Sequence, residues 1–147
     1  MSLAAIKGLP VKNLVMKDCA LLLWTVSSML PEALEVMKSW GFRYINVAFD
    51  WVKTTKSGTA AIGMGYYTRT GSEQCLLATR GKPQILSHAV RQVIRQPRRE
   101  HSRKPDEFYR SVESLFTGPY LDMFARERRD GWTSWGDQTH RFNEAAE

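Results

Sequence analysis

The side chains best able to do chemistry in this sequence are carboxylates and cations beside apolar runs. Asp122 stands within the otherwise apolar stretch YLDMF, and Arg126 lies two residues after the end of that stretch. A carboxylate inside a strand needs a protein partner or a ligand hydroxyl, because its burial without either is costly. Two interpretations of Asp122 therefore stay open: a contact to a polar ligand, or an ordinary ion pair with a neighbouring arginine.

Cations are concentrated between Arg91 and Lys104, where six Arg and Lys face one acid, Glu100. The whole chain carries a formal net charge of +6 and has a pI of about 9.5. A basic balance of this size favours an anionic partner such as nucleic acid. The run would then contact phosphates; the alternative is a solvated basic edge that binds no ligand.

Several common kinds of site are not expected. The three histidines lack metal-ligand spacing and cysteine support, so we predict no metal site. Neither the nucleophile-elbow, the phosphate-loop nor the dinucleotide glycine motif occurs. Cys19 and Cys75 lie in apolar runs and are expected to be reduced core thiols. The stretch GMGYY, which contains Tyr66, could stack a nucleic-acid base or simply pack.

Three segments carry helix signals. Residues 2–8 predict a short helix with Ser2 as its N-cap. The segment LPEALEVMKSWG (30–41) suits a helix that Gly41 closes. Its expected buried stripe is Leu30, Leu34, Met37 and Trp40. KPDEFYRSVESLF (104–116) predicts the third helix, with Pro105 at its first position and acids in its first turn.

Strand signals alternate with these helices. CALLLWTVSS (19–28) is continuously apolar and is expected to be a strand buried on both faces. Three further strands are predicted: RYINVAFDWVKT (43–54), EQCLLATRG (73–81) and PYLDMFAR (119–126). Residues 56–72 and 127–142 are predicted loops, and 138–147 form the tail. ILSHAVRQVIRQ (85–96) fits a helix or a strand equally well.

This alternation predicts a single α/β domain over residues 1–147, with a mostly parallel sheet flanked by helices. Ligands of such sheets bind beyond the carboxyl ends of the strands. Polar or basic residues follow every predicted strand, and we expect them on one edge: Thr25, Ser27 and Ser28; Lys53, Thr54 and Thr55; Arg80 and Lys82; Arg126, Arg128 and Arg129. No signal peptide or membrane-length apolar run is visible, so a soluble, cytoplasmic protein is expected.

Four segments together resemble the MT-A70 family of adenine methyltransferases, its bacterial and phage branch above all. They are LLLWTVSSMLPEALEVMKSWGFRYINVAFDWVKT, GMGYYTRTGSEQCLLATRGKP, PRREHSRKPDEFY and DMFARERRDGWTSWGDQ. The resemblance runs in unbroken order from Met1 to about Gln138. It implies a Rossmann-like methyltransferase fold. It also implies transfer of methyl from S-adenosylmethionine to the exocyclic amine of adenine, in DNA more than in RNA.

The resemblance further implies a cofactor pocket near the end of the chain. Asp122 takes the place of the family's acid, which would accept hydrogen bonds from ribose hydroxyls. The implied cofactor-binding residues are Asp122, Arg126, Arg128, Arg129, Asp137 and Gln138, with Asp137 in place of an amide. Lys104 and Glu73 match positions near the acceptor adenine, so Lys104 would turn toward the pocket mouth. The implied substrate-binding residues are Lys104, Glu73, Arg99, Lys53 and Tyr66.

One departure from the family affects the chemistry. The family carries a DPPW motif whose acid accepts a hydrogen bond from the target amine, and this chain contains neither DPPW, NPPW nor NPPY. MSLAAIKGLP resembles a segment that follows that motif. We therefore expect an N-terminally truncated or split member with no catalytic residue of its own and no methyl transfer by the isolated chain.

The strand that bears the motif normally lies within the sheet, so its absence would leave strand edges unpaired and apolar surface uncovered. An upstream product or a partner chain could supply that strand, or the start of the sequence could be assigned at an internal methionine. A different class of function also stays open, namely a non-catalytic nucleic-acid-binding or partner subunit. Cofactor binding separates the two, because a pure scaffold need not keep a working pocket. A basic structural domain without either ligand is the third, weaker possibility.

Overall fold

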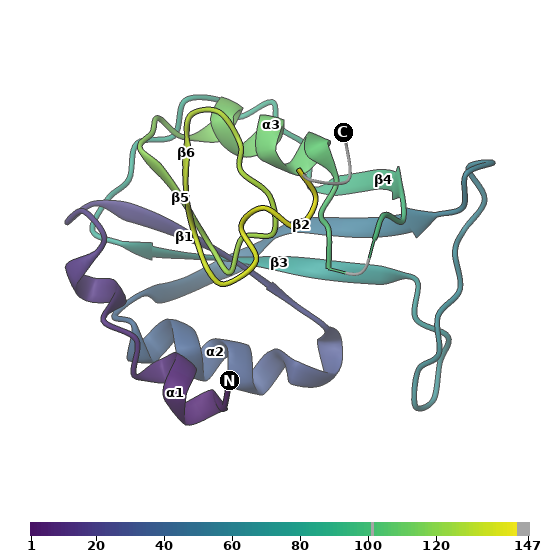
Figure 1. Cartoon of the computed structure of the whole chain (residues 1–147), viewed down its shortest axis with the longest axis horizontal. Coiled ribbons are helices and arrows are strands. Elements are labelled where there is room, and N and C mark those ends of the chain that lie inside the picture. The colour runs from purple at the N-terminus through teal and green to yellow at the C-terminus, as the bar shows by residue number, and fades with distance from the viewer. Residues whose placement is uncertain (101, 144–147) are drawn as a thin grey trace.

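The computed structural model describes residues 1–100 and 102–143. It is an α/β structure in which a sheet lies between helices, with α2 on one face and α3 on the other (Figure 1). The helices are α1 (Leu3–Lys7), α2 (Leu30–Ser39) and α3 (Asp106–Leu115), with short 3-10 turns at Val11–Asn13 and Ser27–Met29. The last residues of the predicted tail, 144–147, lie outside the described residues.

The strands form two sheets. They are β1 (Cys19–Thr25), β2 (Arg43–Thr54), β3 (Ser72–Arg80), β4 (Val93–Pro97), β5 (Tyr120–Met123) and β6 (Trp132–Trp135). The larger sheet has the order β1-β3-β2-β4, and β5 pairs with β6 separately. The ambiguous segment 85–96 thus ends in a strand, β4, rather than a helix.

The larger sheet is mixed, so the expectation of a mostly parallel sheet is wrong. β3 pairs antiparallel with both β1 and β2, while β2 and β4 are parallel. β1 precedes α2 in the chain and β2 follows it. The two strands run in the same direction, but β3 lies between them in the sheet. The connection 55–71 contains no crossover helix, and strands joined without one pair antiparallel.

The direction of β3 also changes which residues share the carboxyl edge of β1 and β2. Thr25 lies opposite Gln74, and Cys19 lies opposite Arg80. Arg80 and Lys82 are therefore at the other end of the sheet, and the expectation that all four polar groups share one edge is wrong. The start of β3, with Glu73, takes their place beside Thr25 and Lys53.

Two hydrophobic clusters cover the two faces of the larger sheet. The first joins α2 to Leu76 and Ala78 of β3, and the second joins α3 to Phe49, Trp51 and Cys75. The buried stripe of α2 differs from the expected one, because Leu34 is 36% exposed and Leu30 is half-buried. Met37 and Trp40 are buried as predicted, and Ala33 and Val36 complete the observed stripe at helical spacing.

Local sequence signals account for most element ends. The Ser2 hydroxyl accepts a hydrogen bond from the Ala5 amide at 3.1 Å, which caps α1 as predicted. Pro105 precedes α3, whose first turn holds two acids that suit the positive end of a helix. β6 lies in a predicted loop, and its alternating WTSW pattern between two glycines was the signal that was missed.

β1 is not buried on both faces as expected. Its residues are half-buried, Thr25 excepted, because the strand lies at an edge of its sheet. Both cysteines are free, with Cys75 buried and Cys19 partly buried. No helix among the described residues has the length and apolarity needed to cross a membrane.

Candidate functional site

The central cleft is a cavity of about 1240 Å³ bordered by β1, β5, α2 and α3. Three of the implied cofactor- and substrate-binding residues line it: Asp122, Arg126 and Lys104. Apolar side chains make up much of the remaining wall, and among them are Leu21, Val36 and Val112. The cleft is thus large, mainly apolar and supplied with a few charged groups, as ligand sites commonly are.

Asp122 places a desolvated carboxylate in this cleft. The Tyr109 hydroxyl donates a hydrogen bond to its Oδ2 at 3.3 Å, so its described partner is a phenol rather than an arginine. Burial raises the pKa of Asp122 to about 6, although the Tyr109 hydrogen bond acts in the opposite direction. Burial also raises the pKa of the Tyr109 hydroxyl, and the nearby negative charge of Asp122 raises it further.

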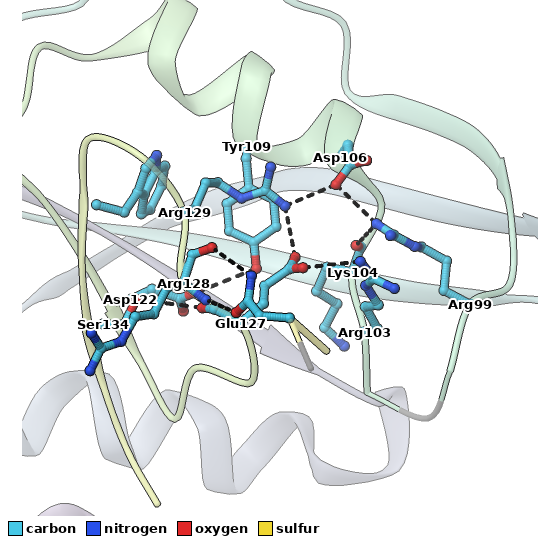
Figure 2. A network of polar contacts seen from close by, with 12 residues as sticks. Arg99, Arg103, Lys104, Asp106, Tyr109, Asp122, Glu127, Arg128, Arg129 and Ser134 are labelled. Atoms are coloured by element: carbon cyan, nitrogen blue, oxygen red, sulfur yellow. Dashed lines mark hydrogen bonds and ion pairs between the residues drawn. The ribbon is translucent and has the colours of Figure 1, made fainter. Parts of the chain in front are cut away.

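The segment after β5 is held to α3 by an arginine–carboxylate network made of Arg99, Glu100, Arg103, Asp106, Glu127 and Arg129 (Figure 2). Glu127 is its centre, since its carboxylate lies 2.8 Å from Arg129 and 3.1 Å from Arg103. Asp106 forms ion pairs with Arg129 and with Arg99, each at 2.9 Å. The hydrogen bond from Arg129 lowers the pKa of the Asp106 carboxyl most strongly, and Arg99 lowers it as well.

Arginine stacking adds to this network. The Arg129 guanidinium lies 3.8 Å from the centre of the Tyr109 ring, the same tyrosine that donates to Asp122. Arg103 lies 4.9 Å from the Phe142 ring. Since cations are attracted to aromatic faces, the Arg129 contact helps to fix the loop between β5 and β6 against α3, and the Arg103 contact holds the segment after β6 to the segment before α3. The network therefore orients Tyr109, and through it Asp122.

A second group of charged side chains gathers at the carboxyl end of β2. The Glu73 carboxylate forms ion pairs with Lys104 and with Lys53, the latter at 3.2 Å. Each lysine also lies over an indole: Lys53 is 5.1 Å from the Trp51 ring and Lys104 is 5.0 Å from the Trp24 ring. Three of the five implied substrate-binding residues are thereby brought together around one carboxylate.

The other two implied substrate-binding residues lie apart from that group. Arg99 donates to Asp106 and to the Lys104 carbonyl oxygen, at 3.3 Å, so it supports the segment that carries Lys104. Tyr66 is 96% exposed on the loop between β2 and β3, which extends away from the helices (Figure 1). The structure therefore does not bring Tyr66 to the Glu73 group.

The implied cofactor-binding residues divide in a similar way. Among the described residues, those lining the central cleft do not include Arg128, Arg129, Asp137 or Gln138. Arg129 belongs to the arginine–carboxylate network. The Arg128 amide donates to the Asn143 side chain at 2.7 Å, and the Gln138 side chain accepts from Arg141 at 3.1 Å. Asp137 is exposed.

The basic run from Arg91 to Lys104 has two parts with different environments. Arg99, Arg103 and Lys104 form ion pairs with acids of the chain. Arg91, Arg95 and Arg98 are exposed. A second pocket of about 390 Å³ is lined by Arg98, with Lys53, Arg99, Arg103 and two acids. Half of the run therefore stabilises the fold, and the other half is presented to solvent.

Two important residues were not singled out from the sequence. Tyr109 is buried on α3, and Glu127 follows directly after Arg126. The only signal for Glu127 is its place as the sole acid within the cationic string RERR. Within 1–100 and 102–143, no cluster of His, Cys, Asp or Glu could hold a metal ion.

Fold and site together define an α/β protein with a carboxylate and a lysine in one large cleft and a cationic surface beside it. Comparison with known proteins makes the class specific. The family model described as MT-A70 matches residues 1–138, so the chain belongs to the MT-A70 family. The resemblance deduced from the four sequence segments is thereby confirmed.

Relatives with reviewed names agree with that membership. The type II methyltransferase M.MunI of Mycoplasma sp is 32% identical over 141 residues, which cover 92% of this chain and 57% of that protein. A putative N(6)-adenosine-methyltransferase of Medicago truncatula is 30% identical over 79% of the chain and 20% of its own length. The human N(6)-adenosine-methyltransferase catalytic subunit METTL3 is 28% identical over 82% and 22%. The chain thus spans little more than half of the first relative and about a fifth of the others.

The central place of Glu127 leads to a stability prediction. Glu127→Gln should lower the free energy of unfolding by about 2–3 kcal/mol, because two partly buried guanidinium groups lose their common counter-charge. Urea denaturation measures this change. The matched control is Glu35→Gln, which removes an exposed ion pair with Lys7 and should cost less than about 1 kcal/mol. Equal losses in the two variants would contradict a central role of Glu127.

The carboxyl of Asp122 predicts a pH dependence. Its folded pKa of about 6 exceeds the ordinary 3.8, so the folded chain binds this proton more tightly than the unfolded chain. Stability should therefore fall as the pH rises from about 4 to about 6 and stay reduced above that window. Asp122→Asn, which keeps an acceptor for Tyr109, should remove up to about 3 kcal/mol of this loss.

The measurement is the free energy of unfolding of parent and variant across that pH window. The control is Asp130→Asn, which changes an exposed carboxylate in the neighbouring loop and should leave the pH profile of the parent unaltered. A parent and an Asp122→Asn variant with parallel profiles would show that Asp122 ionises normally.

Proposed function

We propose that this chain is the cofactor-binding and nucleic-acid-contacting part of an S-adenosylmethionine-dependent adenine methyltransferase. The observation that carries the proposal is the position of Asp122. The chain belongs to the MT-A70 family, and Asp122, which stands at the place of the family's acid, lines a large cleft. The names of two relatives specify N(6)-adenosine methyl transfer, which supports adenine as the acceptor. We favour DNA over RNA as substrate, in the cytoplasm of a bacterium or a phage-infected host.

The residues of the cleft fit S-adenosylmethionine in part. A carboxylate with a raised pKa and a single phenolic donor gains from further hydroxyl donors, which a ribose has. Asp122 would hold the ribose, and Arg126 and Lys104 would place positive charge near the cofactor carboxylate. When bound, the cofactor supplies an activated methyl group on a sulfonium centre. Arg128, Arg129, Asp137 and Gln138 do not line the cleft and are secondary candidates at most.

The Glu73 group is the proposed opening for the target adenine. Trp24 and Trp51 make an apolar floor there, and Lys53, Lys104 and Glu73 offer donors and acceptors to a base. Their mutual ion pairs keep these long side chains ordered before a ligand arrives. The chain has no DPPW to accept from the target amine, so we propose that these 147 residues bind ligands without transferring methyl.

Calorimetry with S-adenosylmethionine tests the cofactor proposal. The parent chain should bind, and Asp122→Ala should weaken binding about 10- to 100-fold, as expected when a charged acceptor of ligand hydrogen bonds is lost. Asp130→Asn serves as the control and should bind like the parent. The same preparation should transfer no labelled methyl group to adenine-containing DNA or RNA.

Two results would count against this proposal. A parent chain that binds no cofactor at high ligand concentration contradicts the cofactor site. Methyl transfer by the isolated chain would instead contradict the conclusion drawn from the absent motif.

A non-catalytic nucleic-acid-binding subunit is the second candidate, and the exposed half of the basic run favours it. Arg91, Arg95 and Arg98 lie on and around β4, and Arg98 also lines the second pocket. Cations in such an arrangement can neutralise phosphates that are several ångströms apart. This binding does not require an intact cofactor pocket, so a chain that binds DNA but no cofactor would favour the scaffold over the enzyme.

The salt dependence of DNA binding measures the contribution of these arginines. In double-stranded DNA binding, replacement of both Arg95 and Arg98 by Ala should reduce the slope of log K against log salt by about 1.8, or about 0.9 for each lost phosphate contact. Lys38→Ala, on the exposed side of α2, removes a cation from the opposite face and should leave the slope unchanged. An unchanged slope in the double variant would exclude this surface.

A further inference from the structure

The connection between β2 and β3 forms an arm, which we define as residues 55–71, and it projects from the end of the sheet (Figure 1). Its two sides meet at an isolated bridge, where the Gly63 amide donates a hydrogen bond to the Thr70 carbonyl oxygen at 2.6 Å. A β-carbon at Gly65 would collide with the Thr68 carbonyl oxygen, so glycine is required where the arm folds back. The arm is therefore a hairpin-like projection with a defined tip, residues 64–69.

The tip of the arm presents large side chains to solvent. Met64, Tyr66 and Tyr67 are each at least 90% exposed, and Ile62 beside them is 69% exposed. At the root of the arm, by contrast, Ala61 is only 3% exposed. Exposed apolar side chains are ordinary when they are scattered singly, but a contiguous group of them marks an interaction site. The packed root and the exposed tip together indicate a surface built for a ligand.

The charge of the arm indicates which ligand this is. Residues 55–71 contain two exposed cations, Lys56 and Arg69, and no acid. A third cation borders the root, because the Arg98 amide donates to the Thr54 carbonyl oxygen at 3.1 Å. Bases of a nucleic-acid strand stack on aromatic rings, and its phosphates attract cations. Protein interfaces also use tyrosine and methionine, but an arm with cations and no acid is complementary to a polyanion.

The root of the arm lies beside the Glu73 group. The Lys53 amide donates to the Gly71 carbonyl oxygen and the Lys53 carbonyl oxygen accepts from the Ala61 amide, each at 2.9 Å. Both sides of the arm therefore flank Lys53, which pairs with Glu73. Tyr66 follows Ala61 by five residues, so the tip is at most about 18 Å from the root, or about five base steps of a stacked strand. A strand with a base at Glu73 thus has its neighbouring nucleotides within reach of the tip.

We propose that the arm binds the nucleotides that flank the target adenine. Tyr66 and Tyr67 stack on unpaired bases of the strand, and Lys56 and Arg69 contact the phosphates beside them. The bases must be unpaired, because the faces of bases inside a duplex are covered by their neighbours until an enzyme extrudes them. This inference rests on the proposed function, since it takes the Glu73 group as the opening for the adenine. It adds a contact outside that group and gives Tyr66 a role at a neighbouring base.

Binding of a single-stranded oligothymidine with one central adenine tests the proposal. Replacement of both Tyr66 and Tyr67 by Ala should weaken binding at least about tenfold, because the stacking platforms are lost. Replacement of both by Phe, which keeps the rings, should preserve the affinity of the parent. Replacement of both by Leu should cost as much as Ala, since Leu is apolar but has no aromatic face. The slope of log K against log salt should be the same in all these variants, because no phosphate contact is removed.

Two further variants complete the comparison. Tyr44→Ala removes an exposed tyrosine at the start of β2, whereas the arm follows the end of that strand, so this variant should bind like the parent. Arg69→Ala should reduce the salt slope for the single strand by about 0.7, the value expected for one lost phosphate contact. The tyrosines and the arginine of the tip are thereby separated by the quantity that each one changes.

Several outcomes overturn the proposal. Parent-like binding by the double Ala variant, while the variant without Arg95 and Arg98 still loses salt slope on duplex DNA, would exclude the arm and leave the proposed nucleic-acid contact intact. Parent-like binding by the Leu variant would show apolar contact in place of stacking. A parent chain that binds neither single-stranded nor duplex DNA would overturn this inference and the nucleic-acid part of the proposed function together. A dimer in light scattering that the double Ala variant dissociates would assign the tip to a second copy.

Discussion

The Glu127 carboxylate is the constraint on which the arrangement of the site depends. No strand pairing connects β5 and β6 to the larger sheet among the described residues, so other forces must hold them. Glu127 lies directly after Arg126 and binds Arg103 and Arg129, and Arg129 in turn binds Asp106 at the start of α3. Packing of Tyr120 and Trp132 against the α3 cluster supplies the apolar share. Charge and packing together thus fix where Asp122 stands.

This way of holding two sheets has a consequence for the cleft. Side-chain contacts bring β1 and β5 to the same cleft, while no strand pairing joins their edges among the described residues. β1 is only half-buried although its sequence is uncharged, because all of its residues border the cleft.

The sequence predicted elements better than their arrangement. Caps and prolines located α1, α2 and α3, and apolar runs located β1, β2 and β3 nearly to the residue. The prediction of strand direction was wrong because direction depends on whether a connection crosses over the sheet. The sequence of the loop 55–71 does not indicate that β3 lies between β1 and β2. The family resemblance implied Asp122, Lys104 and Glu73 as site residues. It could not show that Arg129 binds Asp106 and Glu127, because such a network depends on distances between segments far apart in the chain.

The two halves of the proposed site lie on different sheets, and this division matters for function. Asp122 belongs to β5, whereas Glu73 and Lys53 belong to β3 and β2. Lys104 belongs to neither sheet; it lines the central cleft and at the same time pairs with Glu73, so it connects the two halves. Catalysis needs reacting groups held to within a fraction of an ångström, and a single lysine contact cannot supply that rigidity.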